Sequence, residues 1–206
     1  MKVHVFVEGG GNHPETLRKC RIGFRKLFER AVREENPKLK VEACGSRNEA
    51  YKDFCRFLRQ DDTGTFAILL VDSEAPVAQG ATAWQHLLTR ETIWTRSEGA
   101  DNEQAHLMVH CMEAWFLADT PNLCDFFEKK SKKRVNRKAL RCNPQIEDVA
   151  KEDVRDCLER ATKNVGGYHK TRNAFAILAA IDPAAIRQRS PHADALFEVL
   201  IAKLAR

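Results

Sequence analysis

The chain has 206 residues, which is the size of one domain or of one domain with a helical extension. Hydrophobic residues make up 43% of the sequence and charged residues 31%, a balance typical of a globular protein with a buried core. No apolar run approaches the roughly 20 residues of a membrane span, and the N-terminus lacks the features of a signal peptide, so we expect a cytoplasmic protein with no membrane association.

Positive charge is unevenly distributed along the chain, although the formal net charge is only +5. Eight lysines and arginines lie between residues 129 and 141, preceded by the acid Glu128. One interpretation is a solvated basic loop, and the other is an arm that binds a polyanion such as DNA or RNA. In the second case Lys130, Lys133 and Arg134 are candidate contacts to the nucleic acid backbone.

The first predicted strand ends in an acid and three glycines. Valines alternate with His4 and Phe6 up to residue 7, a pattern typical of a β-strand, and Glu8 follows directly. Because ligands bind at the carboxyl ends of strands in open α/β folds, Glu8 is a candidate site residue. The glycines at positions 9–11 do not form a G-x-x-x-x-G-K-[ST] phosphate loop, because its lysine is absent, so we expect no ATPase site.

An amphipathic helix is predicted from the glycines to about residue 36. Apolar residues recur along it at spacings of three and four, and Pro37 is expected to end it. Arg18 and Lys19 lie in its first turn, beside the glycines, where they could reach a bound phosphate. The other basic residues of this helix are interpreted as its solvated face.

Two further strands and a second helix are predicted next. A short strand at 39–44 precedes Ser46 and Glu49, which match a capping box at a helix start. The unbroken apolar run at 65–71 is typical of a central parallel strand that is covered on both faces. It ends in Asp72-Ser73-Glu74.

A fourth strand is predicted at 105–112, after a helix near residues 84–88, and Glu113 opens a helical turn behind it. The first 120 or so residues thus alternate between strands and helices. We therefore expect an α/β fold, with a Rossmann-like parallel sheet of about four strands flanked by helices. Residues 121–206 are predicted to form a mainly helical C-terminal extension packed on the core of residues 1–120. Its helices are predicted at 122–130, 146–164 and 175–181, with Asp182-Pro183 and Ser190-Pro191 beginning two more.

Three acids stand at the ends of two predicted strands: Glu8 after the first, and Asp72 and Glu74 after the third. If these strands are parallel neighbours, the acids converge at one edge of the sheet. Clustered carboxylates repel one another, and such an arrangement persists mainly when a hard cation neutralises it. Oxygen ligands with open positions favour Mg²⁺ or Mn²⁺, and Glu113 could supply a further ligand. Each acid alone could equally be a turn residue, but the occurrence of all three at strand ends is a more specific indication of a metal site.

This conjunction resembles a known family. The segment Val5-Phe6-Val7-Glu8-Gly9, followed by Leu69-Leu70-Val71-Asp72-Ser73-Glu74, is similar to the Toprim domain. Toprim is the metal-dependent phosphoryl-transfer domain of topoisomerases, primases and OLD-type (overcoming-lysogenization-defect) nucleases. The chain resembles more closely an uncharacterised Toprim-like bacterial family, a domain of unknown function often found in phage-defence gene neighbourhoods. That closer resemblance rests on residues 109–119, 167–171 and 190–192.

The resemblance implies a Toprim-like fold in which Glu8, Asp72 and the acid two residues later hold the metal. The chain departs from the usual D-x-D pattern because Glu74 occupies the last position. Its side chain is one methylene longer than that of Asp, which leaves the ligand geometry and the metal preference open.

A lysine near such a site can stabilise charge on a phosphate. Lys170, which follows a pair of glycines and His169, is a candidate for this role, and His169 is a candidate contact to phosphate or nucleic acid. The alternative is an ordinary surface lysine.

The first hypothesis for function is a Mg²⁺- or Mn²⁺-dependent nuclease that acts on DNA or RNA. In this hypothesis Glu8, Asp72, Glu74 and Lys170 form the catalytic site, and a partner ATPase encoded nearby joins the protein in phage defence. A competing hypothesis is a non-catalytic Toprim-like module that binds nucleic acid or a partner, which the D-x-E departure favours. A small-molecule phosphohydrolase is a third option, against which the basic stretch argues.

Overall fold

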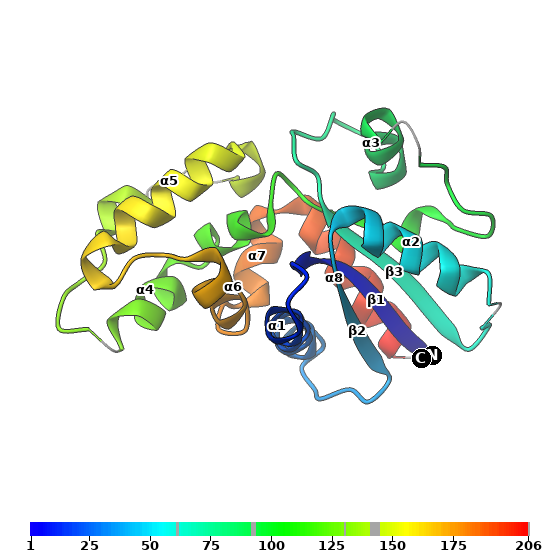
Figure 1. Cartoon of the computed structure of the whole chain (residues 1–206), viewed down its shortest axis with the longest axis horizontal. Helices are drawn as coiled ribbons and strands as arrows, with labels where there is room; N and C mark the ends of the chain where they lie inside the picture. The colour runs from blue at the N-terminus through cyan, green and yellow to red at the C-terminus, as the bar shows by residue number, and fades with distance from the viewer. Residues whose placement is uncertain (61, 92–93, 130, 141–144, 206) are drawn as a thin grey trace.

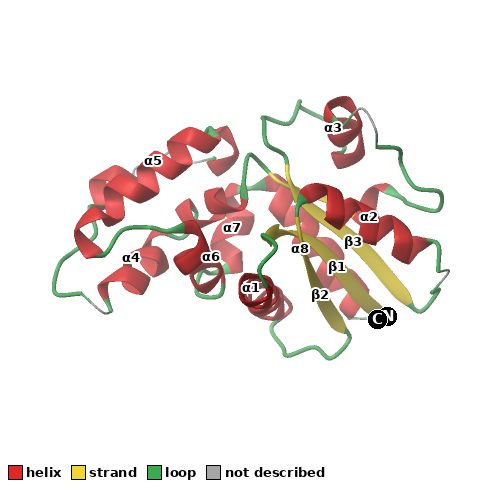
Figure 2. Cartoon of the chain, in the orientation of Figure 1, coloured by secondary structure: helices red, strands yellow, loops and turns green. Residues whose placement is uncertain are grey.

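In the described part of the chain, four parallel strands form one sheet (Figures 1 and 2). The inner strands are β1 (Lys2–Gly10) and β3 (Thr65–Asp72), and the edge strands are β2 (Leu39–Gly45) and β4 (Ala105–Met108), in the order β2-β1-β3-β4. This computed structural model describes all residues except 61, 92–93, 130, 141–144 and 206. The predicted α/β arrangement with a parallel, Rossmann-like sheet flanked by helices is confirmed.

The two faces of the sheet bury two separate apolar cores, because successive side chains of a strand point to opposite faces. Val5 and Leu70 pack with α1 (Pro14–Val32) and α8 (Pro191–Leu204). Phe6 and Leu69 pack on the other face, with α2 (Arg47–Leu58) and α3 (Ala83–Arg90). Figure 1 shows the sheet between α2 and α8. Inner strands covered on both faces account for the unbroken apolar run at 65–71.

The first helix ends earlier than predicted. α1 stops at Val32 because Arg33 takes a left-handed conformation, with φ of 61°. Its backbone N–H donates to the carbonyl of Arg30, and the N–H of Glu34 donates to that of Glu29. Such a left-handed cap satisfies the last carbonyls of a helix. The expectation that Pro37 ends the helix is therefore wrong.

The fourth strand is also shorter than predicted, since β4 ends at Met108 rather than at residue 112. The chain turns at His110, whose φ is 58°. It then enters the buried 3-10 helix η2 (Met112–Leu117), so the helical turn predicted at Glu113 is present. A second 3-10 turn, η1 (Asn102–Gln104), leads into β4.

The chain beyond residue 120 is helical, as predicted, and its last helix returns to the sheet. Figure 1 shows α4 and α5 on the side away from the strands, whereas α8 lies against β1 and β4. α8 therefore shares a core with the strands, and the division near residue 120 stays a prediction. The further elements are α4 (Thr120–Glu128), η3 (Arg137–Leu140), η4 (Ile146–Asp148), α5 (Lys151–Thr162), η5 (Lys163–Val165), α6 (Lys170–Leu178) and α7 (Pro183–Arg189).

Local capping signals predicted helix starts better than apolar periodicity did. The side chain of Asp182 accepts from the N–H of Ala184, and that of Ser190 accepts from the N–H of Ala193, so both predicted caps are confirmed. By contrast, the helix predicted at 146–164 is broken into η4, α5 and η5, and α6 begins at Lys170 rather than at residue 175. Among the described residues, no helix combines the length and the apolar character needed to cross a membrane.

We predict that Gly23→Ala destabilises the protein although alanine is the better helix former by about 1 kcal/mol. A Cβ at Gly23 of α1 would lie 2.6 Å from the carbonyl oxygen of Phe175 in α6. The free energy of unfolding, measured by urea denaturation, should fall by about 1–3 kcal/mol. Lys26→Ala on the exposed face of α1 is the control and should change it by less than about 0.5 kcal/mol. An unchanged or higher stability of Gly23→Ala would contradict the close approach of the two helices.

Candidate metal centre

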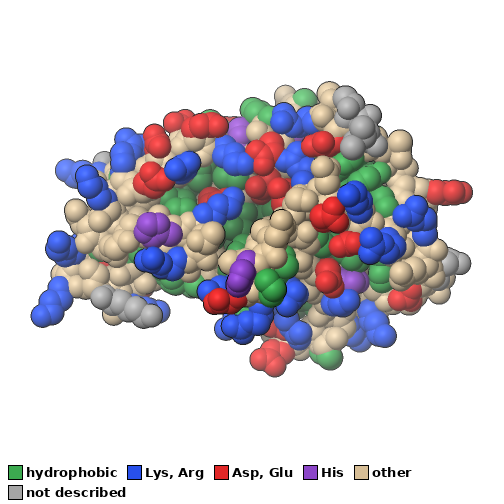
Figure 3. Space-filling view, in the orientation of Figure 1, with side chains coloured by type: hydrophobic (Ala, Val, Ile, Leu, Met, Phe, Trp, Pro, Cys, Tyr) green, Lys and Arg blue, Asp and Glu red, His purple; other side chains and the backbone are tan. Residues whose placement is uncertain are grey.

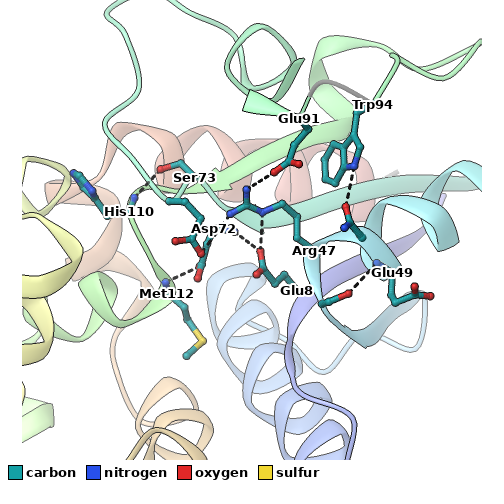
Figure 4. A network of polar contacts seen from close by, with 12 residues as sticks. Glu8, Arg47, Glu49, Asp72, Ser73, Glu91, Trp94, His110 and Met112 are labelled. Carbon is teal, nitrogen blue, oxygen red and sulfur yellow. Dashed lines mark hydrogen bonds and ion pairs between the residues drawn. The ribbon is translucent and has the colours of Figure 1, made fainter. Parts of the chain in front are cut away.

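Glu8 and Asp72 meet because their strands are direct neighbours. In the parallel pairing of β1 with β3, Val7 lies opposite Leu70, so both chains reach the same edge of the sheet at these acids. One carboxylate oxygen from each of Glu8, Asp72 and Glu74 lies within 4.8 Å of the others. We call these three side chains the carboxylate cluster. The predicted convergence of the three acids is confirmed, and Figure 4 shows Glu8 and Asp72 side by side.

Backbone donors orient the two acids from opposite sides. Glu8 has the strand parity of Phe6, on the α2 face, whereas Asp72 has that of Leu70, on the α1 face. The N–H of Asp72 donates to Glu8 Oε2 at 3.0 Å. The N–H of Met112, at the start of η2, donates to Asp72 Oδ1 at 2.8 Å. Each carboxylate therefore has one oxygen held by the backbone.

Glu74 sits on a strained backbone that a second loop holds in place. Its φ is 60°, an uncommon value for a residue other than glycine. Its N–H donates to the carbonyl of His110 at 3.2 Å, and the N–H of His110 donates to Ser73 Oγ at 2.7 Å. The loops after β3 and β4 thus support each other. Strained conformations that persist through such contacts cluster at functional sites.

The cluster is costly to charge in the absence of a cation. Burial raises the pKa of Asp72 well above its usual value, and the charges of Glu8 and Glu113 raise it further. Burial also raises the pKa of Glu8, against the opposing charge of Arg47. A bound cation would remove this cost, because it favours the ionised form of each acid.

Two basic side chains that the sequence analysis did not identify contact the carboxylate cluster. Arg47, the first residue of α2, lies with Nε 3.5 Å from Glu8 Oε2 and Nη2 3.4 Å from Glu74 Oε1. Lys151, the first residue of α5, has Nζ 2.5 Å from Glu74 Oε2. The nearest sequence signal was the cap at Ser46, whose Oγ accepts from the N–H of Glu49 at 3.2 Å. That signal locates the start of α2 but not its distance from Glu8.

The capping box predicted at this helix start is only half formed. The carboxylate of Glu49 pairs with Lys52 at 2.9 Å rather than with the backbone of Ser46. The hydroxyl cap is present, and the reciprocal contact predicted from the sequence is replaced by this ion pair.

Glu113 forms a neighbouring group with two other predicted residues. Its Oε1 accepts from Tyr168 Oη at 3.2 Å and pairs with Lys170 Nζ at 3.2 Å. It lies outside the carboxylate cluster, although its charge raises the pKa of Asp72. Its role as a metal ligand therefore stays a prediction.

A cavity of about 510 Å³ opens beside the cluster, between α5 and the start of α6. Lys151, His169 and Lys170 line it together with Glu113, so the predicted phosphate-binding pair lies next to the acids. Figure 3 shows acidic and basic side chains around a hollow near the centre of this face. The cavity beside the cluster thus carries both acidic side chains, from Glu113, Glu152 and Glu159, and basic ones.

Other predicted phosphate contacts lie elsewhere. Arg18 is exposed on α1, and Lys19 pairs with Glu15 at 2.7 Å. Arg134 pairs with Glu128 at 2.7 Å, and Lys133 is exposed. These two residues follow α4, at the end of the molecule away from the strands (Figure 1), and Lys130 lies outside the described residues. Contact of all these side chains with nucleic acid stays a prediction.

The chain matches the model of one protein family over residues 7–201, and it therefore belongs to that family, Domain of unknown function (DUF4276). The matched range includes the carboxylate cluster and most of α8. Neither the curated proteins nor the solved structures contain a significant match. Membership of a family of unknown function is thus confirmed, whereas its relation to Toprim domains stays a prediction.

We predict that Asp72→Asn stabilises the metal-free protein in a pH-dependent way. The pKa of Asp72 is higher in the folded protein than in the unfolded chain, so its ionisation costs stability. That cost is absent below the unfolded pKa of about 3.8, grows as the pH rises and is complete above the folded pKa. In EDTA at pH 7, the free energy of unfolding should rise by about 1–3 kcal/mol.

The gain should shrink toward zero as the pH approaches 4, because Asn keeps the oxygen that accepts from Met112 and only the charge differs. Denaturant unfolding across this pH range measures both effects. Asp156→Asn, on the exposed face of α5, is the matched control and should give little change at any pH. A loss of stability at pH 7 in Asp72→Asn would contradict the cost assigned to its buried charge.

Proposed function

We propose that the protein is a divalent-cation-dependent phosphodiester hydrolase, a nuclease in which Glu8, Asp72 and Glu74 hold Mg²⁺ or Mn²⁺. The observation that carries this proposal is the convergence of three carboxylate oxygens within 4.8 Å of one another, beside a cavity whose lining includes Lys151 and Lys170. Acids supply the ligands of a hard cation, and lysines bind the phosphate oxygens that such a cation also contacts.

The donor set fits this kind of ion. Oxygens bound to one Mg²⁺ lie about 2.1 Å from it, and so at most about 4.2 Å from each other. Adjacent oxygens in such an octahedral site lie about 3.0 Å apart, so the oxygens of the cluster, which lie within 4.8 Å of one another, would have to move closer by side-chain rotation. The backbone occupies Glu8 Oε2 and Asp72 Oδ1, and a cation would replace Arg47 or Lys151 at an oxygen of Glu74. When bound, the ion would neutralise charge on a phosphate and lower the pKa of a water molecule.

The cavity residues would bind and orient the substrate. Lys170, held by Glu113, would contact a phosphate oxygen, and Lys151 would do so from the opposite helix. His169 is exposed at the start of α6 and lines the same cavity. A volume of about 510 Å³ lies in the range of small-ligand pockets and accommodates a group of nucleotide size.

The resemblance to Toprim domains supports the same chemistry. Glu8, near the end of β1, and Asp72, at the end of β3, lie on the two inner, neighbouring strands of a parallel sheet, as expected for a Toprim-like site. We propose that the substrate is DNA or RNA, that the protein acts in the cytoplasm, and that a partner ATPase accompanies it in phage defence. The separate basic segment that includes Lys133 would guide the nucleic acid backbone.

A non-catalytic module that binds nucleic acid or a partner is the second candidate. It is favoured by the cations already present at the cluster, since Arg47 and Lys151 together contact both oxygens of Glu74. In that case the acids would hold Arg47 and Lys151 in position to bind nucleic acid or a partner. The D-x-E sequence would then belong to a site that no longer cleaves.

We predict that the protein cleaves plasmid DNA, single-stranded DNA or RNA with Mg²⁺ or Mn²⁺ and not in EDTA. Glu8→Gln and Asp72→Asn remove a ligand charge but keep the size of the side chain, and should each lower the rate at least about 100-fold. Glu29→Gln, which removes an acid that pairs with Arg25 on α1, is the control and should cleave normally. Undiminished cleavage by both site variants would exclude the carboxylate cluster as the active site. Binding without cleavage, with Mn²⁺ bound, would favour the non-catalytic module.

We predict that Lys170→Gln lowers kcat/KM about tenfold or more, because a phosphate contact beside the cavity is lost. Lys163→Gln, in the short helix η5, removes a similar charge from an exposed position and should have little effect. Steady-state rates on a short oligonucleotide compare the two variants. Equal rates would make Lys170 an ordinary surface lysine.

A further inference from the structure

Arg47 is in contact with three acids at once. Besides Glu8 and Glu74, its guanidinium pairs with Glu91 through Nη1 at 2.7 Å. The side chain is largely buried, with 13% of its surface exposed. Figure 4 shows it between Glu8 and Glu91. An arginine stays protonated at any working pH, so this charge is permanent.

The three contacts are unequal. The 2.7 Å contact with Glu91 is a short charge-assisted hydrogen bond. The contacts with Glu8 and Glu74, at 3.5 and 3.4 Å, are longer ion pairs. Glu91 lies outside the carboxylate cluster. The closest partner of Arg47 is therefore an acid outside the cluster.

Glu91 is also fixed to the helix that carries Arg47. Glu91 follows α3, and its carbonyl accepts from the N–H of Trp94 at 3.0 Å. The indole of Trp94 donates to Asn48 Oδ1 at 3.0 Å and stacks on Tyr51 with ring centroids 4.1 Å apart. Asn48 and Tyr51 both belong to α2. Glu91 is therefore held, through Trp94, beside the first turn of the helix that carries Arg47.

We propose that Arg47 is the internal counter-ion of the carboxylate cluster, and that it competes with a divalent cation for Glu8 and Glu74. This inference rests on the metal site of the proposed function. Without the cation, the guanidinium neutralises two of the clustered acids. With the cation, like charges repel at short range, and the guanidinium withdraws onto Glu91. Arg47 therefore raises the cation concentration at which the site becomes occupied.

The test is Mn²⁺ binding to the full chain, measured by isothermal titration calorimetry after EDTA treatment and dialysis. Arg47→Gln should bind Mn²⁺ about tenfold more tightly than the wild type, because one competing charge is removed next to the site. Arg56→Gln removes the same charge from α2, where the guanidinium pairs with Asp53 and is exposed, and should leave the affinity unchanged. In EDTA the Tm of Arg47→Gln should fall below that of the wild type, and added Mn²⁺ should raise it by more.

A double-mutant cycle with Glu91 provides a second readout. Glu91→Gln removes the charge that pairs with Arg47 outside the cluster. Arg47 should then pair only with Glu8 and Glu74, and Mn²⁺ binding should be weaker. If the effect passes through Arg47, Glu91→Gln should change the affinity much less in the Arg47→Gln background. An equal effect in both backgrounds would overturn the inference, because it would be a direct charge effect of Glu91.

The remaining outcomes separate this inference from the metal site itself. Wild-type protein that binds Mn²⁺, combined with equal or weaker binding by Arg47→Gln, overturns the competition and leaves the metal site intact. Absence of Mn²⁺ binding in both proteins at millimolar concentration overturns both. Binding by Arg47→Gln alone supports the competition in its strongest form.

Discussion

Glu8 and Asp72 lie close together at one edge of the sheet, and the surrounding structure has to accommodate their two charges. Because β1 and β3 pair in parallel, their carboxyl ends lie at the same edge of the sheet. Both acids are largely buried there. Burial and mutual repulsion make their charges expensive. Three carboxylates at this edge of the sheet could hold a metal ion, which would offset that cost.

The features around this pair compensate for its charge. Backbone N–H groups bind one oxygen of each acid, and Arg47 and Lys151 supply positive charge from two helices. The strained turn at Glu74 is maintained by hydrogen bonds from the loop after β4. These contacts fix the acids in place and put positive charge beside them. In the metal site that we propose, a cation would therefore compete with Arg47 for Glu8 and Glu74.

Local sequence patterns predicted elements well where one physical cause dominated. The apolar run of β3 reflects burial on both faces, and Asp182 and Ser190 cap helices through their own side chains. Patterns failed where distant contacts decide. The end of α1 depends on the backbone conformation of Arg33, and that of β4 on the turn at His110, and neither has a strong sequence signature. Charge density at 129–141 was visible in the sequence, but its distance from the acids was not.

The sequence by itself determined the α/β class, the parallel sheet and the acids Glu8, Asp72 and Glu74, because strand periodicity and strand-end position are local properties of the chain. Only the tertiary structure decided which cations accompany them. Arg47 and Lys151 lie 39 and 79 residues along the chain from Glu8 and Asp72, respectively, and nothing in their neighbours marks them as site residues. They reach the cluster because α2 packs on β1 and β3 and because α5 begins beside Glu74. Charge partners of this kind are set by the packing of whole helices, which no local pattern encodes.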